Sequence, residues 1–243
     1  MIAALPMYDR PEAQAANDAF WQAIRARLGR GPETLDRTRG LQEVWCAGDL
    51  LLSQTCNLPW RLGLQGRAQL VGCPDYGLDD CPPGYYNSVL VARRDDPRDL
   101  DSLLAARVVI NQGHSQSGYG ALWALAAARG ATPNITAESG GHIASARMVA
   151  RGEADLACID AHSLRGIRAF DPDAAELRAV ATTAASPATP YITGPREDPA
   201  GIRAAMRAAL GDLPPATRAA LGLRDVVEMP AAAILSLPTP PAR

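Results

Sequence analysis

The sequence predicts an α/β protein of two lobes, each a mostly parallel sheet flanked by helices. Three observations lead to this prediction. Short apolar runs with β-branched residues alternate with runs of strong helix formers along most of the chain. The block 93–183 is a self-contained series of such alternations, and the strand-like run 86–92 precedes it. Segment 184–194, which follows the block, is rich in proline and small residues, as connectors are.

The block is therefore predicted to be inserted into a lobe made from both ends of the chain. Lobe 1 would comprise residues 1–90 and 187–243, and lobe 2 residues 91–186. The chain would cross between them near 88–93 and near 183–194. Two crossings form a hinge, and the cleft between the lobes is the expected place for a small ligand.

The elements of lobe 1 follow from local signals. Pro11 begins an amphipathic helix that ends near Leu28, since proline suits the first helical turn. Further helices are expected over 199–210 and 215–221, and the proline-rich tail 237–243 is expected to be frayed. Apolar runs predict strands at 2–5, 43–45, 49–52, 68–73 and 86–93.

The elements of lobe 2 alternate more regularly. Strands are expected at 107–111, 134–138, 155–160 and 177–182, and helices over 118–129, over 142–151 and from 161 onward. Where parallel strands are neighbours in a sheet, the loops that follow them lie at the same carboxyl edge. Ligands bind at this edge in open α/β sheets.

The loop after the first of these strands carries the most chemical information. It reads Asn111-Gln-Gly-His-Ser-Gln-Ser-Gly-Tyr-Gly120 and precedes a helix-forming run. Backbone N–H groups at the helix start, with the side chains of Ser115, Gln116 and Ser117, would converge on one anion. An ordinary serine helix cap is the simpler alternative.

A second loop of the same kind follows about 25 residues later. It reads Ser139-Gly-Gly-His142 and opens the next predicted helix. His142 could donate to the same anion, or it could be a partly exposed capping histidine.

Composition excludes several other classes. The net charge is −2 and the arginines are scattered with few aromatic residues among them, so no nucleic-acid surface is predicted. All 24 Lys or Arg positions are arginine, which excludes Schiff-base chemistry and a Walker-type lysine. No apolar run is long enough to span a membrane. No metal site and no cofactor are predicted, since there is no Cys-x-x-Cys pair and no dinucleotide fingerprint.

The cysteines leave two questions open. Cys73 and Cys81 flank an irregular loop and would be bridged in an oxidising compartment, whereas free thiols are favoured in the cytoplasm. Cys56 lies in a loop that is expected to line the site, so a reactive thiol is a minor alternative.

In these motifs the chain resembles the phosphate/phosphite/phosphonate-binding proteins of ABC importers, which have the type 2 periplasmic-binding-protein fold. Four segments carry the resemblance, in this order: 49–56 (Asp-Leu-Leu-Leu-Ser-Gln-Thr-Cys), 85–92 (Tyr-Tyr-Asn-Ser-Val-Leu-Val-Ala), 115–119 (Ser-Gln-Ser-Gly-Tyr), and Gly141-His142 with the later run 151–160. The resemblance covers most of the chain. It implies a monomeric solute-binding protein that closes its two lobes around a small oxyanion and meets an ABC-transporter permease.

The resemblance also implies roles for particular residues. The oxyanion would be held by a helix start and a histidine, and polar residues near the first crossing and near Gln54 would face the cleft from the other lobe. Asp160 could hold a ligand amine or cap the helix that follows, and Tyr8 could close the pocket or be a surface residue. The full set of expected ligand-binding residues is Tyr8, Gln54, Thr55, Tyr86, Asn87, Ser88, Ser115, Gln116, Ser117, Gly118, His142 and Asp160.

Two alternatives remain open on the same scaffold. One is a small-molecule enzyme of the lyase or dehydratase type, which needs a general base such as His142, Asp160 or Cys56, although no two of these form a recognisable dyad by spacing. The other is a cytoplasmic ligand sensor. The N-terminal residues lack a signal peptide, so a cytoplasmic location is predicted for the chain as it begins here, and a periplasmic one if the start is mis-assigned or trimmed. A donor set without charge could equally hold a sulfonate or carboxylate.

Overall fold

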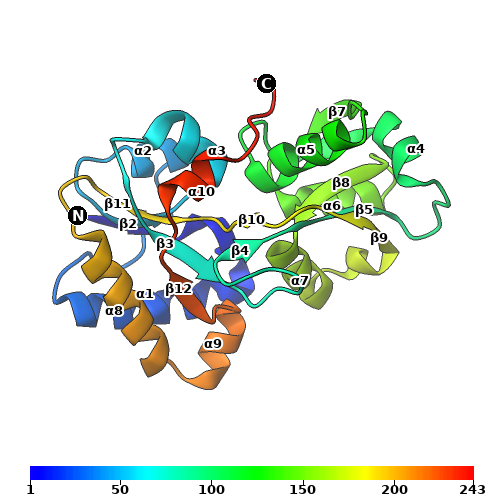
Figure 1. Ribbon diagram of the computed structural model, residues 1–243. Coiled ribbons are helices and arrows are strands. Elements are labelled where there is room, and N and C mark those ends of the chain that lie inside the picture. The colour runs from blue at the N-terminus through cyan, green and yellow to red at the C-terminus, as the bar shows by residue number, and fades with distance from the viewer. The chain divides into compact units, whose positions relative to one another are not determined.

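The computed structural model describes residues 1–243, and the contacts within it divide the chain into two units. Unit 1 comprises Met1–Tyr85 and Pro187–Ser236, and unit 2 comprises Tyr86–Ser186 and Leu237–Arg243. Each unit is a sheet flanked by helices, so the predicted α/β class is confirmed (Figure 1). The chain passes between the units three times, once more than the sequence led us to expect.

Unit 1 is built on a five-stranded sheet. In spatial order its strands are β1 (Ile2–Ala4), β2 (Leu50–Gln54), β11 (Tyr191–Thr193), β3 (Gln69–Asp75) and β12 (Asp225–Val227). Its helices are α1 (Gln14–Leu28), α2 (Leu41–Trp45), α3 (Asn57–Pro59), α8 (Pro199–Asp212), α9 (Pro215–Leu221) and α10 (Ala231–Leu235). Helices α1 and α8 pack on each other, and α8 also packs on β3 and β12.

Unit 2 has a second five-stranded sheet. In spatial order its strands are β7 (Ile135–Glu138), β6 (Val108–Ile110), β8 (Leu156–Asp160), β5 (Ser88–Arg93) and β9 (Leu177–Thr182). Its helices are α4 (Leu100–Ala105), α5 (Ala121–Ala128), α6 (His142–Ala150) and α7 (Ala161–Phe170), and a π-helical segment, Gln116–Gly120, precedes α5. The first two crossings pair with each other as the short strands β4 (Tyr85–Tyr86) and β10 (Ser186–Pro187).

The central strands of unit 2 are buried on both faces, which explains their continuous apolar sequence. In β8, Leu156 and Cys158 pack into a cluster with Tyr119 and Leu122, beside α5. The alternate residues Ala157 and Ile159 pack into a second cluster, with residues of α6 and α7. Both faces of the sheet are therefore covered by helices, and the carboxyl ends of its strands lead into loops.

Strand directions differ from the mostly parallel sheets that the sequence predicts. The pairs β1–β2, β6–β7 and β6–β8 are parallel, but β11 runs antiparallel to β2 and β3, and β5 runs antiparallel to β8 and β9. Strands β5 and β11 are the first full strands after a crossing. They enter their sheets directly from the connection, without the helical crossover that parallel neighbours require.

Three local predictions need correction. The segment 43–45 is part of helix α2 rather than a strand, because a turn beginning at Gly40 buries Val44 and Trp45 together. Residues 86–90 belong to unit 2, where β5 pairs with β8 and β9. The tail 237–243 also packs in unit 2, so it is not frayed.

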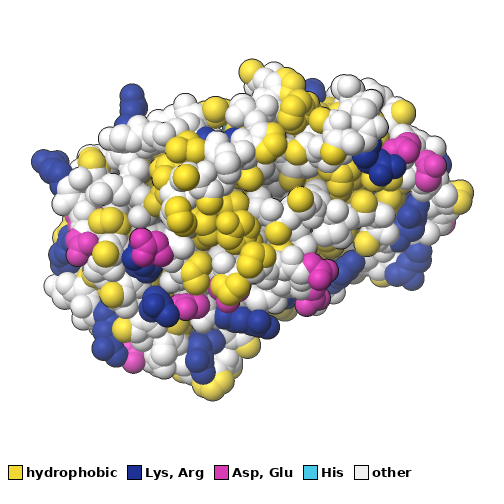
Figure 2. Space-filling model, in the orientation of Figure 1, with side chains coloured by type: hydrophobic (Ala, Val, Ile, Leu, Met, Phe, Trp, Pro, Cys, Tyr) yellow, Lys and Arg dark blue, Asp and Glu magenta, His cyan; other side chains and the backbone are white.

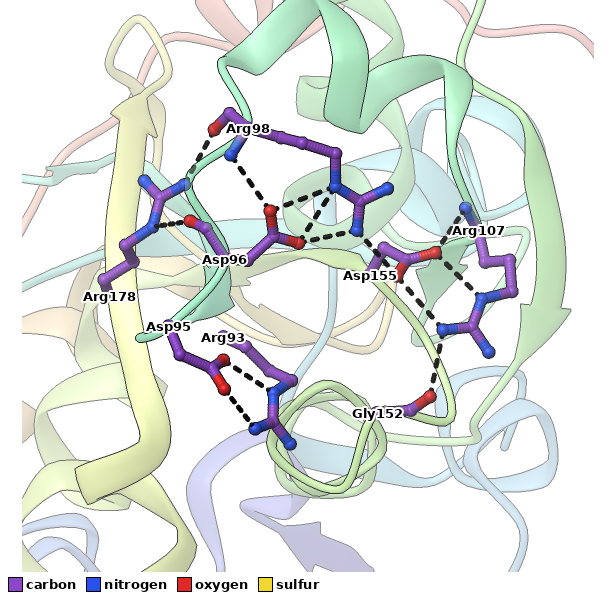
Figure 3. Close-up of polar contacts among 8 residues, drawn as sticks. All are labelled: Arg93, Asp95, Asp96, Arg98, Arg107, Gly152, Asp155 and Arg178. Carbon is purple, nitrogen blue, oxygen red and sulfur yellow. Dashed lines mark hydrogen bonds and ion pairs between the residues drawn. The ribbon is translucent and has the colours of Figure 1, made fainter.

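An ion-pair network joins the ends of several strands and helices of unit 2 (Figure 3). Asp155 precedes β8 and receives two hydrogen bonds from the guanidinium of Arg107, at 2.8 and 3.0 Å, and one from its backbone N–H at 3.0 Å. Arg98 bridges Asp155 and Asp96 with Nη2, at 2.8 and 2.6 Å. These bonds give a structural role to the end of the segment 152–155 (Gly-Glu-Ala-Asp), because Asp155 fixes the start of β8.

Arginine side chains are dispersed over the face shown in Figure 2, and several lie beside Asp or Glu. None of the helices combines the length and the apolar character that crossing a membrane requires.

Candidate functional site

Two loops and the end of β8 meet at one edge of the unit 2 sheet, because β6, β7 and β8 run parallel and end there. The loop after β6 leads into the π-helical segment, the loop after β7 leads into α6, and β8 leads directly into α7. The first two loops are joined by backbone hydrogen bonds, from Ser139 N to Ile110 O at 2.9 Å and from Gly140 N to Asn111 O at 2.8 Å. Their side chains are therefore held close together.

His142, the first residue of α6, lies at the centre of these loops. Its Nε2 atom is 2.9 Å from the hydroxyl of Ser117, 3.2 Å from Oδ2 of Asp160 and 3.5 Å from the amide nitrogen of Asn111. The side chain of His142 is 12% exposed and that of Asp160 is 2% exposed, so the group is almost dry. We call Asn111, Ser117, His142 and Asp160 the histidine cluster.

The environment of His142 favours its neutral form when no ligand is bound. Burial lowers the pKa of the imidazole below its usual 6.5, and the carboxylate of Asp160 opposes part of this effect. The second ring nitrogen, Nδ1, is buried and has no hydrogen-bond partner. An anion placed against the ring would favour protonation, so the cluster combines a hydroxyl donor with a group that can gain positive charge.

Ser115 shapes the loop as a helix cap. Its backbone is extended, and its hydroxyl accepts a hydrogen bond from the backbone N–H of Gly118 at 3.0 Å. It also lies 3.5 Å from the hydroxyl of Ser117. Gln116 is buried in the first turn of the π-helical segment. The contacts of Ser115 are thus those of an ordinary serine helix cap, which is the simpler of the two interpretations. A direct contact between Ser115 and an anion stays a prediction.

The carboxylate of Asp160 contacts two neighbours at once. Its Oδ1 accepts a hydrogen bond from the backbone N–H of Ser163 at 2.8 Å, which makes Asp160 the N-cap of α7, and its Oδ2 faces His142. The capping alternative is therefore seen in the structure. Whether Asp160 also holds a ligand amine stays a prediction.

The residues expected near the first crossing lie beside the histidine cluster. Ser88 is opposite Asp160 in the pairing of β5 with β8, and the carbonyl of Asn87 accepts a hydrogen bond from the backbone N–H of Ala161 at 3.0 Å. Tyr86 precedes them and is 1% exposed. Main-chain pairing thus places these three residues at the same end of β8 as Asp160.

The other three expected residues belong to unit 1 and lie around Tyr76. The side-chain amide of Gln54 donates to the hydroxyl of Tyr76 at 3.1 Å and to the hydroxyl of Thr189 at 3.0 Å. Tyr8 packs edge-on against Tyr76, with 5.2 Å between the ring centroids. The backbone N–H of Thr55 donates to the carbonyl of Pro190 at 2.9 Å. These hydrogen bonds therefore make Gln54 part of the internal structure of unit 1.

The histidine cluster contains the residue types of a hydrolytic triad but not the geometry. In a triad, the serine and the carboxylate lie on opposite nitrogens of the imidazole, so that a proton passes through the ring. Here Ser117 and Asp160 both lie at Nε2 of His142. The arrangement holds the ring in place and does not relay a proton from the serine.

Sequence reasoning missed one member of the cluster. Asn111 is 8% exposed, and the sequence pattern marks it only as the start of the loop. Its position directly after a buried strand, at the carboxyl edge, was the available signal. The structure contains no disulfide, and no group of three or more His, Cys, Asp or Glu residues could hold a metal ion.

The fold is that of solute-binding proteins, with two α/β units joined by several crossings of the chain. The family described as "ABC transporter, phosphonate, periplasmic substrate-binding protein" matches residues 2–229, and the chain belongs to it. This is a family of binding proteins and not of enzymes, so the predicted solute-binding role for phosphonate-like ligands is confirmed and the lyase alternative is not supported. No curated protein matches the sequence.

Solved structures of similar fold include members of such transport systems. PhnD1 from Prochlorococcus marinus, in complex with methylphosphonate, has a TM-score of 0.77 at 12% identity, with 96% of this chain and 93% of that chain covered. A Xanthomonas citri protein bound to ATP has a TM-score of 0.68 at 16% identity, covering 98% and 94%. A binding-protein component of a phosphonate ABC transporter from Pseudomonas aeruginosa has a TM-score of 0.68 at 14% identity, covering 92% and 80%. At these low sequence identities, the structural similarity establishes the fold alone.

The family corrects the predicted location. It consists of periplasmic substrate-binding proteins, so the cytoplasmic location inferred from the N-terminal residues is wrong. That inference relied on the absence of a signal peptide in the first residues of the sequence alone.

Proposed function

We propose that the histidine cluster and the backbone N–H groups of the neighbouring loops hold the oxyanion of a phosphonate-like ligand. One observation carries the proposal: the hydroxyl of Ser117 and the imidazole of His142 meet at 2.9 Å, each at the start of a helical segment. Helix starts present unpaired N–H groups and a partial positive charge. Together they supply several donors to one point at the sheet edge.

The donors proposed for the oxyanion, which are the Ser117 hydroxyl and the backbone N–H groups, are uncharged. They can therefore bind an anion without a cation that must be desolvated in the free protein. His142 can gain a proton when the anion arrives. Methylphosphonate, phosphite and phosphate are the probes that match this chemistry, and a sulfonate or a carboxylate is the alternative ligand.

The test is calorimetry with methylphosphonate and with the other four anions. Ser117→Ala removes one hydrogen bond to a charged ligand, and such bonds contribute about 1.5–3 kcal/mol, so affinity should fall roughly 10- to 100-fold. His142→Ala should abolish binding at micromolar concentrations. The matched control is His114→Ala, because His114 is exposed and lies in the same loop. Unchanged affinity in both cluster variants would remove the proposed site.

The proposal includes a monomeric protein whose two units close around the ligand and whose closed form a permease recognises. Residues Tyr8, Gln54 and Thr55 of unit 1 would complete the site in that form. Small-angle scattering with and without saturating methylphosphonate tests closure, since the radius of gyration should decrease on binding. Identical profiles at saturation would refute closure.

A further inference from the structure

The last seven residues, 237–243, leave unit 1 after α10 and pack within unit 2. They form the third crossing of the chain, and Figure 1 shows this red segment passing towards α5. Pro240 is buried in this packed state. The segment therefore has specific contacts, and we call it the strap.

The contacts of the strap lie on the loop that carries Ser117. The hydroxyl of Tyr119 donates a hydrogen bond to the carbonyl of Pro241 at 2.9 Å. The guanidinium carbon of Arg243 lies 6.0 Å from the centroid of the Tyr119 ring, within the range of a cation–π contact. A methyl group added at Gly113 would lie 3.1 Å from Cβ of Arg243, so the loop backbone and the strap are closely packed.

Tyr119 links the strap to the histidine cluster. It belongs to the π-helical segment Gln116–Gly120, two residues after Ser117, and its ring is 3% exposed within the core cluster beside α5. Its backbone N–H donates to the carbonyl of Ser115 at 3.3 Å. One end of the side chain is thus fixed in the core and the other by the strap.

This segment needs such support because of its geometry. A π-helical turn is less favourable than an α-helical one and persists where surrounding contacts hold it. The position of Ser117 relative to His142 depends on that turn. If the strap were absent, the hydroxyl of Tyr119 would lose its protein acceptor and the turn would lose one of its supports.

We propose that the strap positions the anion-binding loop, with Tyr119 as the positioning residue through which it acts. The inference rests on the function proposed above. In this arrangement the strap touches no ligand. It keeps Ser117 within hydrogen-bond distance of His142, so the site is formed before the ligand arrives and little affinity is lost to ordering the loop.

The experiment compares the methylphosphonate affinity of the unaltered protein with that of four variants. Deletion of residues 238–243 should weaken binding about tenfold, and Tyr119→Phe, which loses only the hydroxyl, about threefold. Arg243→Lys should retain near-normal affinity because it keeps a cation over the ring, whereas Arg243→Ala should weaken binding about twofold to threefold. Amide resonances of Ser117 and Gly118, followed by NMR without ligand, should shift in the deletion variant and in Tyr119→Phe.

The outcomes separate this inference from the proposed function. If the unaltered protein fails to bind methylphosphonate or any of the other anions, the function fails, and the NMR shifts still test the strap. If it binds and Tyr119→Phe shows both unchanged affinity and unchanged amide resonances, the strap is refuted even where the deletion variant does not fold. A loss of stability with no change in affinity or in those resonances would also refute it, because the strap would then be only structural.

Discussion

Replacing Gly118 by alanine is the sharpest test of how tightly the anion-binding loop is packed. Gly118 lies inside the π-helical segment and has no positive φ, so its backbone accepts any residue. The obstacle is space. An alanine methyl would lie 2.7 Å from Cγ of Asn111, closer still to its Oδ1, and 3.2 Å from Cε1 of His142. The side chain of Asn111 must therefore move, and His142 must yield by a few tenths of an ångström.

Two opposing effects set the size of the loss. Overpacking a buried site destabilises a protein by about 1–3 kcal/mol. We expect about 2 kcal/mol here, because the methyl group would approach a buried side chain closely. Alanine recovers about 0.5–1 kcal/mol because glycine loses more backbone entropy inside a helix. The net destabilisation is about 1 kcal/mol, which for a chain of this length lowers Tm by about 2–4 °C. Displacing Asn111 and His142 should reduce methylphosphonate affinity by at least about tenfold.

Gly141→Ala is the matched control. Gly141 precedes His142 and its backbone is extended, with φ of −173°, and a methyl group there would meet no atom within 4 Å. This variant should bind methylphosphonate normally and keep its Tm. Calorimetry and thermal unfolding measure both effects. Gly118→Ala with the affinity and Tm of Gly141→Ala would show that the cluster is not closely packed and would refute the reasoning.

Three further predictions concern charge and burial. Burial lowers the pKa of His142 in the free protein and a bound anion raises it, so binding near pH 6 should take up protons. Calorimetry in buffers of different ionisation heat should show less proton uptake by His142→Gln than by the unaltered protein. Equal uptake by the two proteins would contradict this prediction. Hydrogen bonds from arginine hold the pKa of Asp155 well below its usual range, so Asp155→Asn should lower the free energy of unfolding in urea by about 1–2 kcal/mol at pH 7. This difference in stability should shrink below about pH 4. The control is Asp95→Asn, at an exposed ion pair, which should cause no measurable change in stability. Burial raises the pKa of Cys158 to about 12, so a thiol reagent at pH 8 should modify exposed Cys46 and spare Cys158 until the protein unfolds, and similar rates would be contrary to this prediction.

The approach of Ser117 to His142 could be predicted from the sequence. Each follows a β-rich run by a short loop, and the rule that parallel strands end at one edge brings such loops together. Asp160 followed from the same rule, as the last residue of the next strand. Their ligand-binding roles stay predictions that the binding experiments decide.

Other features could not be predicted because they depend on contacts between distant residues. The direction of β5 is fixed by how the chain enters the unit, and no local pattern records it. The bond from Tyr119 to Pro241 joins residues that are 122 positions apart. The run at 43–45 looks like a strand because its residues are apolar, and only the bonds begun at Gly40 make it helical.

The pairing of Ser88 with Asp160 has a consequence for redesign of this protein. Ser88 is the third residue after the first crossing, and its backbone also exchanges hydrogen bonds with Thr183, just before the second. Under the proposed function, a substitution at Ser88 would therefore affect the ligand site and the connecting segments at the same time. A biosensor engineer who wants to change one of these alone should vary the first turn of α6 and leave the connecting strands as they are.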